Sequence, residues 1–82
     1  MIVSNTLRSG SYANHNYKIV DNGDVISVII EAFKKLDDRL LIAPAHAEKG
    51  VAIFKNKVYW TYKMGFNPDV IIADIINKLF KI

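Results

Sequence analysis

His46 and Glu48 are the residues whose types and spacing come closest to a catalytic or metal-binding pair. They lie two positions apart, so both side chains point the same way if this stretch is extended. An imidazole beside a carboxylate can act as an acid–base pair or supply two ligands to a metal ion. A metal site needs three or four ligands, however, and no others lie nearby in the sequence, so two solvated loop residues are the alternative interpretation. His15 is isolated in the same way.

A second pattern interleaves basic and aromatic residues in the same part of the chain. Its members are Lys49, Lys55, Lys57, Tyr59, Trp60, Tyr62 and Lys63. Aromatic rings flanked by cations can bind single-stranded nucleic acid. Two of the rings, Trp60 and Tyr62, share a strand face with apolar neighbours and are expected in the core. Only Tyr59 and Lys63 remain available, so we expect nucleic-acid binding to be weak at most.

Other chemistry is hard to find in the sequence. It contains no Gly-rich phosphate loop, no nucleophile elbow and no triad spacing. There is no cysteine, and the formal net charge of +3 favours anionic partners only slightly. We therefore expect a protein that is not an enzyme and that needs no cofactor and no metal. Its 82 residues, 51% of them hydrophobic, fit one α+β domain over 1–82.

The element that should position these residues is a β-hairpin over 51–63. Two runs rich in β-branched and aromatic residues flank Asn56-Lys57, and asparagine tolerates the positive φ of a tight turn. This turn would pair Phe54 with Tyr59 and Ile53 with Trp60. Both faces of the hairpin are apolar, and a lone hairpin is only marginally stable in water, so both faces should be covered.

Two helices are expected to provide this cover. Asp24 resembles an N-cap, and the apolar spacing that follows predicts a helix over about 24–37, with a strand over 25–30 as the competing interpretation. Asn67-Pro68-Asp69 begins a second helix over about 68–80. Its expected buried stripe is Ile72, Ile75, Ile76 and Leu79, with Ile71 and Phe80 at its sides. The residues expected to face outwards are Asp69, Asp74, Asn77, Lys78 and Lys81.

The N-terminal third gives weaker signals. Residues 17–20 alternate as a strand does, and Asp21-Asn22-Gly23 indicates the turn that ends it. Residues 1–3 could form an edge strand, and Ser9-Gly10-Ser11 is typical of a loop. The whole is expected to be a small antiparallel sheet, built on the hairpin and packed by one helix on each face or by one helix and a partner molecule.

No segment of the sequence is apolar for the roughly 20 residues that a membrane span needs. The first eight residues also lack the basic and apolar regions of a signal peptide. We therefore expect a cytoplasmic protein.

The stretch from Gly50 to Gly65, GVAIFKNKVYWTYKMG, resembles the closing hairpin of bacterial CAP-superfamily (SCP-like) domains. In that family a Gly-Val-Gly-Val strand precedes a Tyr-Trp-Thr-Gln-x-Phe-Gly strand. The segment Arg39–Pro44 is similar to the family's Arg-x-Asn-Ile-Leu-Asn-Pro segment, and Glu31-Ala-Phe33 lies where the family has an Ala-Trp helix. Asn16-Tyr-Lys-Ile19 is loosely similar to its Glu-Asn-Ile-Ala turn, so the resemblance covers about 16–65.

The resemblance implies a reduced CAP-like core with a small-ligand cleft, in which the C-terminal helix replaces the missing cover over the sheet. The departures concern the cleft itself. The family's long first helix has no counterpart here, His15 stands where the family has an acid, and the second cleft histidine is absent. No functional residue can therefore be transferred from the family.

The absence of a catalytic constellation and the apolar excess favour a non-enzymatic binding protein that acts through a surface patch as a homodimer. Its expected contact residues are Tyr12, Tyr17, Tyr59 and Lys63, with His46 and Glu48 as weaker candidates. The partner is expected to be another protein or a second copy. Three alternatives remain: a phage- or mobile-element-encoded inhibitor of a host enzyme, a CAP-like domain with a ligand cleft, and a weak nucleic-acid binder.

Overall fold

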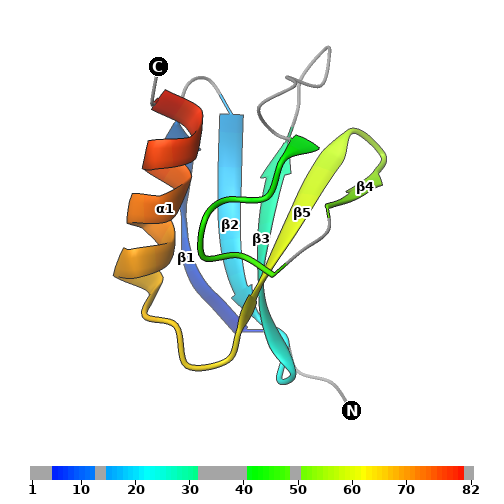
Figure 1. Cartoon of the computed structure of the whole chain (residues 1–82). Coiled ribbons are helices and arrows are strands. Elements are labelled where there is room, and N and C mark those ends of the chain that lie inside the picture. The colour runs from blue at the N-terminus through cyan, green and yellow to red at the C-terminus, as the bar shows by residue number, and fades with distance from the viewer. Residues whose placement is uncertain (1–4, 13–14, 32–40, 49–50, 81–82) are drawn as a thin grey trace.

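The computed structural model describes residues 5–12, 15–31, 41–48 and 51–80, which form a small α+β domain (Figure 1). Its elements in chain order are β1 (Asn5–Tyr12), β2 (His15–Asp21), β3 (Val25–Glu31), β4 (Ala52–Phe54), β5 (Lys57–Lys63) and α1 (Pro68–Phe80). The five strands form one sheet in the order β1-β2-β3-β5-β4, and every neighbouring pair is antiparallel. The α+β class and an antiparallel sheet containing the hairpin are confirmed. The predicted edge strand at 1–3 lies outside the described residues.

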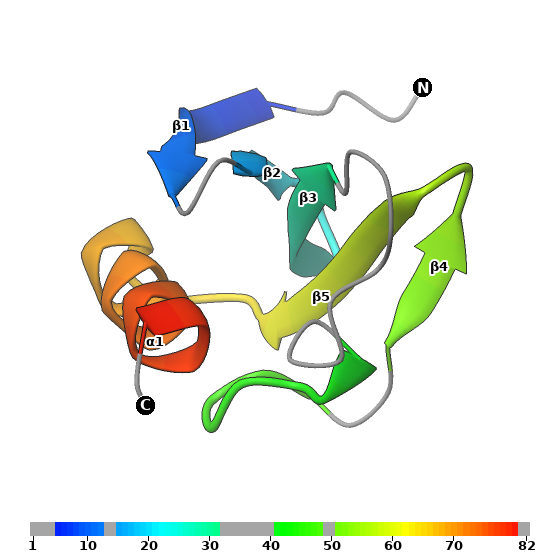
Figure 2. The ribbon, with the colours of Figure 1, turned by 90° about the horizontal axis from the view of Figure 1, so that it is seen from above.

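The sheet has a covered face and an open face. Figure 2 shows α1 and the segment 41–48 on the same side of the sheet, and we call this side the covered face. No helix among the described residues lies on the other side, which we call the open face. The expectation of one helix on each face is therefore wrong for the described part of the chain.

The predicted helix over 24–37 is wrong where it can be compared, because residues 25–31 form β3 at the centre of the sheet. Residues 32–37 lie outside the described part. A nearly continuous apolar run satisfies helical and strand spacing alike, and here the β-branched residues follow their preference for strands. Asp24 caps no helix; it belongs to the turn between β2 and β3, where Gly23 has φ +89° and donates its N–H to Asp21 Oδ1.

The hairpin of β4 and β5 forms, but with its turn at Lys55-Asn56 instead of Asn56-Lys57. Both turn residues have positive φ, 50° and 61°, as a type I′ turn requires. Phe54 therefore pairs with Lys57 and Ile53 with Val58. Moving the turn by one residue shifts the pairing by two, so each side chain keeps the face that was predicted for it.

β1 is a further departure, because Ser9-Gly10-Ser11 was expected to be a loop. The strand pairs with β2 along its length, with an irregularity between Thr6 and Arg8. Gly10 lies opposite Tyr17, and a Cβ atom at Gly10 would be 2.7 Å from Tyr17 Oη. The tyrosine ring therefore occupies the space that a side chain at position 10 would need.

α1 begins as predicted at Pro68. The backbone N–H of Asp69 donates to Asn67 Oδ1 over 2.8 Å, and the N–H groups of Val70 and Ile71 donate to the Asn67 carbonyl. The buried side of the helix is rotated from the expected stripe, however. Ile71, Asp74 and Ile75 are buried, whereas Ile72 and Ile76 are only partly buried. The inward position of Asp74 is thus a correction to the prediction that it faces solvent.

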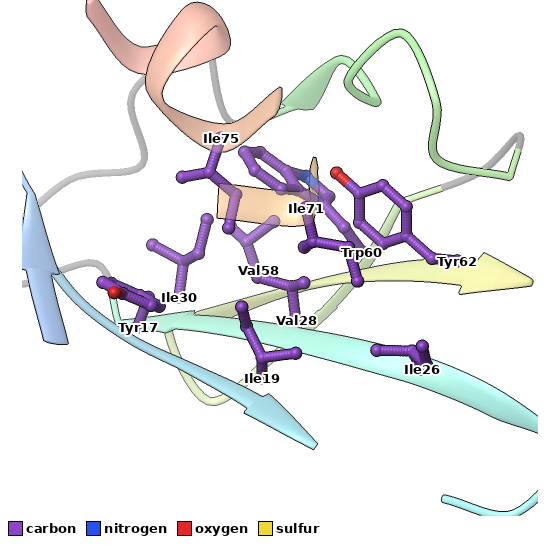
Figure 3. Packing of buried hydrophobic residues seen from close by; sticks show 10 residues of the cluster. All are labelled: Tyr17, Ile19, Ile26, Val28, Ile30, Val58, Trp60, Tyr62, Ile71 and Ile75. Carbon is purple, nitrogen blue, oxygen red and sulfur yellow. The ribbon is translucent and has the colours of Figure 1, made fainter. Parts of the chain in front are cut away.

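The core lies between α1 and the covered face. Alternate residues of β2, β3 and β5 supply it, and Ile71 and Ile75 reach it from the helix (Figure 3). Its members are Tyr17, Ile19, Ile26, Val28, Ile30, Val58, Trp60, Tyr62, Ile71 and Ile75. Ala47 packs against it from the segment 41–48, and Phe66 packs against it from the connection to α1. Within the described residues, no helix has the length and apolarity to span a bilayer.

Candidate functional site

The open face carries lysines, polar groups and apolar side chains, and two residues that lie opposite each other on it, Val20 of β2 and Ser27 of β3, are buried. Along β5, every second residue points to it, namely Lys57, Tyr59, Thr61 and Lys63, while Val58, Trp60 and Tyr62 point into the core. Tyr59 is opposite Ile29 of β3, and Ile29 is opposite Lys18 of β2, so these three side chains form a row across the sheet. Tyr59 and Ile29 are partly buried, and Lys18 is exposed.

A groove of about 480 Å³ lies beside this row. Ser9 and Ser11 line it from β1, and Lys18 lines it from β2. At its other side Glu31 and Lys57 face each other across β3 and β5, with Lys57 Nζ 3.6 Å from Glu31 Oε1. Both of these side chains are close to half exposed, so the ion pair is weak and leaves the lysine accessible to an anion.

On the covered face, Asp74 of α1 joins three parts of the chain. Its Oδ2 accepts a hydrogen bond of 2.8 Å from the Tyr62 hydroxyl and one of 3.1 Å from the backbone N–H of His46. The carboxyl group is buried, and these two donors offset the cost of removing it from water. Burial, and then the hydrogen bond and negative charge of Asp74, raise the pKa of the Tyr62 phenol far above its usual range. Tyr62 is therefore a fixed neutral donor.

His46 and Glu48 do not form the predicted pair. The segment that carries them is held by its backbone, because the N–H of Glu48 donates to the Thr61 carbonyl and that of Ala47 to the Pro44 carbonyl. The His46 ring lies 6.2 Å from that of Phe66. A pocket of about 330 Å³ beside it is lined by His46, Asp74 and Lys78 among others. In the ranges that the structure describes, no group of three His, Cys, Asp or Glu residues could hold a metal ion.

The remaining predicted contact residues are distributed over both faces. Tyr59 and Lys63 share the open face, four residues apart on β5. Tyr17 is buried on the covered side over Gly10, so it is separated from Tyr59 by the sheet. Tyr12 ends β1, and its side chain lies outside the described part. His46 and Glu48 lie on the segment 41–48, apart from the open face.

Sequence reasoning missed most of the groove. Lys18 could have been found, because the strand predicted over 17–20 alternates and places it on the side opposite Tyr17 and Ile19. Ser9 and Ser11 carried no such signal, since they join the groove only through the pairing of β1 with β2. Glu31 was missed because a helix was expected over 24–37 instead of the strand that pairs Glu31 with Lys57.

β4 is the outermost of the described strands on its side of the sheet, and its outer edge is apolar. Ile53 is 48% exposed and Phe54 61% exposed, on opposite faces of the strand. Leu41 and Ile42, which begin the segment 41–48, are also exposed. We call the exposed Ile53 and Phe54 the apolar edge of β4.

Comparison with known proteins finds no matching family model, no matching curated protein and no matching solved structure. The similarity to CAP-superfamily hairpins therefore stays a prediction. The geometry of the open face and of the β4 edge is the basis for the function proposed below.

Proposed function

We propose that this chain is a non-enzymatic interaction protein that binds through the free edge of β4, and that its partner is a second copy of the same chain. The observation that carries the proposal is the exposed apolar edge strand. Exposed apolar side chains that gather at one place commonly mark a protein-binding surface. Here they coincide with backbone groups that are available for strand pairing.

The backbone of β4 supports this proposal. Phe54 and Lys57 flank the two-residue turn, so Phe54 exchanges hydrogen bonds with β5, as does Ala52 two residues earlier. The N–H and C=O of Ile53 consequently point away from the sheet. Natural edge strands are kept from pairing by being very short, by a lysine or a proline, or by a bulge. The three residues of β4, Ala-Ile-Phe, include neither lysine nor proline, and its pairing with β5 is regular.

A second copy satisfies this edge with its own identical edge. Two β4 strands pairing antiparallel about a two-fold axis at Ile53 would bond their outward N–H and C=O groups to each other. The Ile53 side chains of both copies would then meet on the covered side, and the contact is closed, so it gives a dimer and not a fibre. Contact through a patch of this kind needs no catalytic residues.

The experiment is a measurement of mass by light scattering during size-exclusion chromatography at high micromolar concentration. Wild type should show the mass of two chains. Ile53→Lys should show the mass of one, because a charge at the pairing position opposes its own copy. Val70→Lys is the matched control, since Val70 is exposed to a similar degree on α1, away from the edge. A single-chain mass for wild type, or an Ile53→Lys variant that remains dimeric, would contradict the proposal.

A further inference from the structure

The open face of β5 presents a repeated pattern of cation, ring, hydroxyl and cation. Lys57, Tyr59, Thr61 and Lys63 follow one another at two-residue intervals, which correspond to about 6.6 Å each along a strand. The two lysines are therefore separated by about 20 Å in the direction of the strand. Lys18 is exposed two strands away, in the row that contains Tyr59.

Two aromatic side chains lie within this frame of amines. Tyr59 is partly buried and lies opposite Ile29 of β3. Phe54 is opposite Lys57 and so points to the same face; its position is diagonal to Tyr59, at a typical spacing of about 7–8 Å. Lys55 Nζ lies 5.3 Å from the centroid of the Phe54 ring, so a further cation accompanies this aromatic side chain.

The charge of this surface is positive. Lys18, Lys57 and Lys63 point to it from the strands, whereas Glu31 is the acid that lines the groove. The whole chain also has a formal net charge of +3. The partner that fits is consequently an anion, and an extended one, because the lysines are spread along and across the strands instead of converging on one point.

We propose that the open face binds single-stranded nucleic acid, with the lysine amines contacting phosphates and the rings of Tyr59 and Phe54 stacking on bases. Aromatic platforms inside a basic groove are the general means by which proteins hold single strands without reading their sequence. The hydroxyl groups of Ser9, Ser11 and Thr61 can donate to phosphate or sugar oxygens. Regularly spaced amines that alternate with aromatic rings match the repeating phosphates and bases of a nucleic acid strand better than they match a protein surface. Ile53, the proposed pairing position on β4, points to the covered side, so this activity does not depend on dimerisation.

The test uses fluorescence anisotropy of a labelled oligothymidylate titrated with the full chain at low salt. Wild type should bind, and the logarithm of the association constant should fall with the logarithm of salt concentration at a slope near −2, for about three phosphate contacts at roughly 0.7 each. Lys18→Gln should make this slope shallower by about 0.7. Lys78→Gln on α1 removes one positive charge from the other side of the sheet and should change neither slope nor affinity.

Tyr59→Ala should weaken binding roughly tenfold, and Tyr59→Phe should retain it, because stacking needs the ring and not the hydroxyl. Circular dichroism would show that both variants are folded. The Ile53→Lys variant should still bind the oligonucleotide, which keeps this test separate from the test of self-association.

Three outcomes would overturn the proposal. The first is the absence of salt-dependent binding by wild type at low salt. The second is an equal effect of Lys18→Gln and Lys78→Gln. The third is a poly-glutamate competitor that displaces the oligonucleotide at equal charge concentration and is bound as tightly by Tyr59→Ala. That last result would assign the face to acidic proteins instead.

Discussion

Trp60 and Tyr59 are neighbours on β5, yet they belong to two different environments. Trp60 has no exposed surface and lies in the core beneath α1, whereas Tyr59 is partly exposed on a face that no described helix covers. The composition of the hairpin gave both faces an apolar character, and only one of them became the core. The difference shows that apolar residues on a strand indicate a surface that favours burial. They do not indicate whether another part of the same chain covers that surface.

The largest expected loss of stability distinguishes Trp60 from Tyr59. Trp60→Ala should lower the free energy of unfolding by about 3–5 kcal/mol, because it leaves a large cavity between α1 and the sheet. Tyr59→Ala should lower it by less than about 1 kcal/mol. Urea denaturation followed by far-ultraviolet circular dichroism would measure both. Similar losses for the two variants would show that the open face is as important to folding as the covered one.

A smaller loss of stability is expected at the hydrogen bonds that join α1 and the segment 41–48 to β5. Tyr62→Phe removes the hydroxyl that donates to Asp74 and should cost about 1–3 kcal/mol at neutral pH, since a buried carboxyl group loses one of its two donors. Asp74→Asn is the matched variant, because its amide oxygen can still accept from Tyr62. It should cost less than Tyr62→Phe, as measured by the same denaturation experiment; the reverse order would mean that the charge of Asp74 dominates.

The same contact predicts a dependence on pH. The pKa of Tyr62 is raised in the folded protein above the ordinary value of 10.0, so the unfolded chain loses this proton first as pH rises. The contribution of this group to stability is complete below pH 10 and should decline above it, by up to about 1.4 kcal/mol per pH unit. Tyr62→Phe should show a flatter decline than wild type between pH 10 and 11. Identical slopes would contradict the raised pKa.

The smallest expected loss of stability concerns Gly10 on β1, at the edge of the covered face. Gly10→Ala would place a Cβ atom 2.7 Å from Tyr17 Oη and 2.8 Å from the ring, so the ring must move. We expect a loss of about 1 kcal/mol in the free energy of unfolding from this overpacking. Ser9→Ala, the adjacent change on the open face, should stay within about 0.5 kcal/mol of wild type. Equal values for both variants would show that Tyr17 moves aside without cost.

The elements with local signals were predictable. Asn67-Pro68-Asp69 defines the start of α1 within its own three residues, and the β4–β5 hairpin follows from two β-rich runs around a turn. The exact turn was not predictable, because asparagine accepts positive φ at either central position and both registers bury the same faces. β3 was ambiguous for a different reason: a run that is apolar on every side has no periodicity to distinguish a strand from a helix.

The parts of the candidate site that escaped prediction depend on contacts between distant residues. Asp74 faces inwards because Tyr62, 12 residues away, and the backbone of His46, 28 residues away, donate to it. A helical wheel contains neither donor, so it assigned the carboxylate to solvent. The groove likewise exists only because β1 pairs with β2, and a Ser-Gly-Ser sequence does not favour a strand without that pairing.

The position of α1 on one side of the sheet affects how the affinity of the proposed dimer for a ligand strand depends on the length of that strand. If two copies join at β4 about a two-fold axis, both helices lie on the same side, and the two open faces lie next to each other on the other side. A ligand strand long enough to cross the junction would then meet the second surface at a high effective concentration. Its affinity would rise steeply once it passed that length, whereas a shorter strand would gain nothing from the second copy.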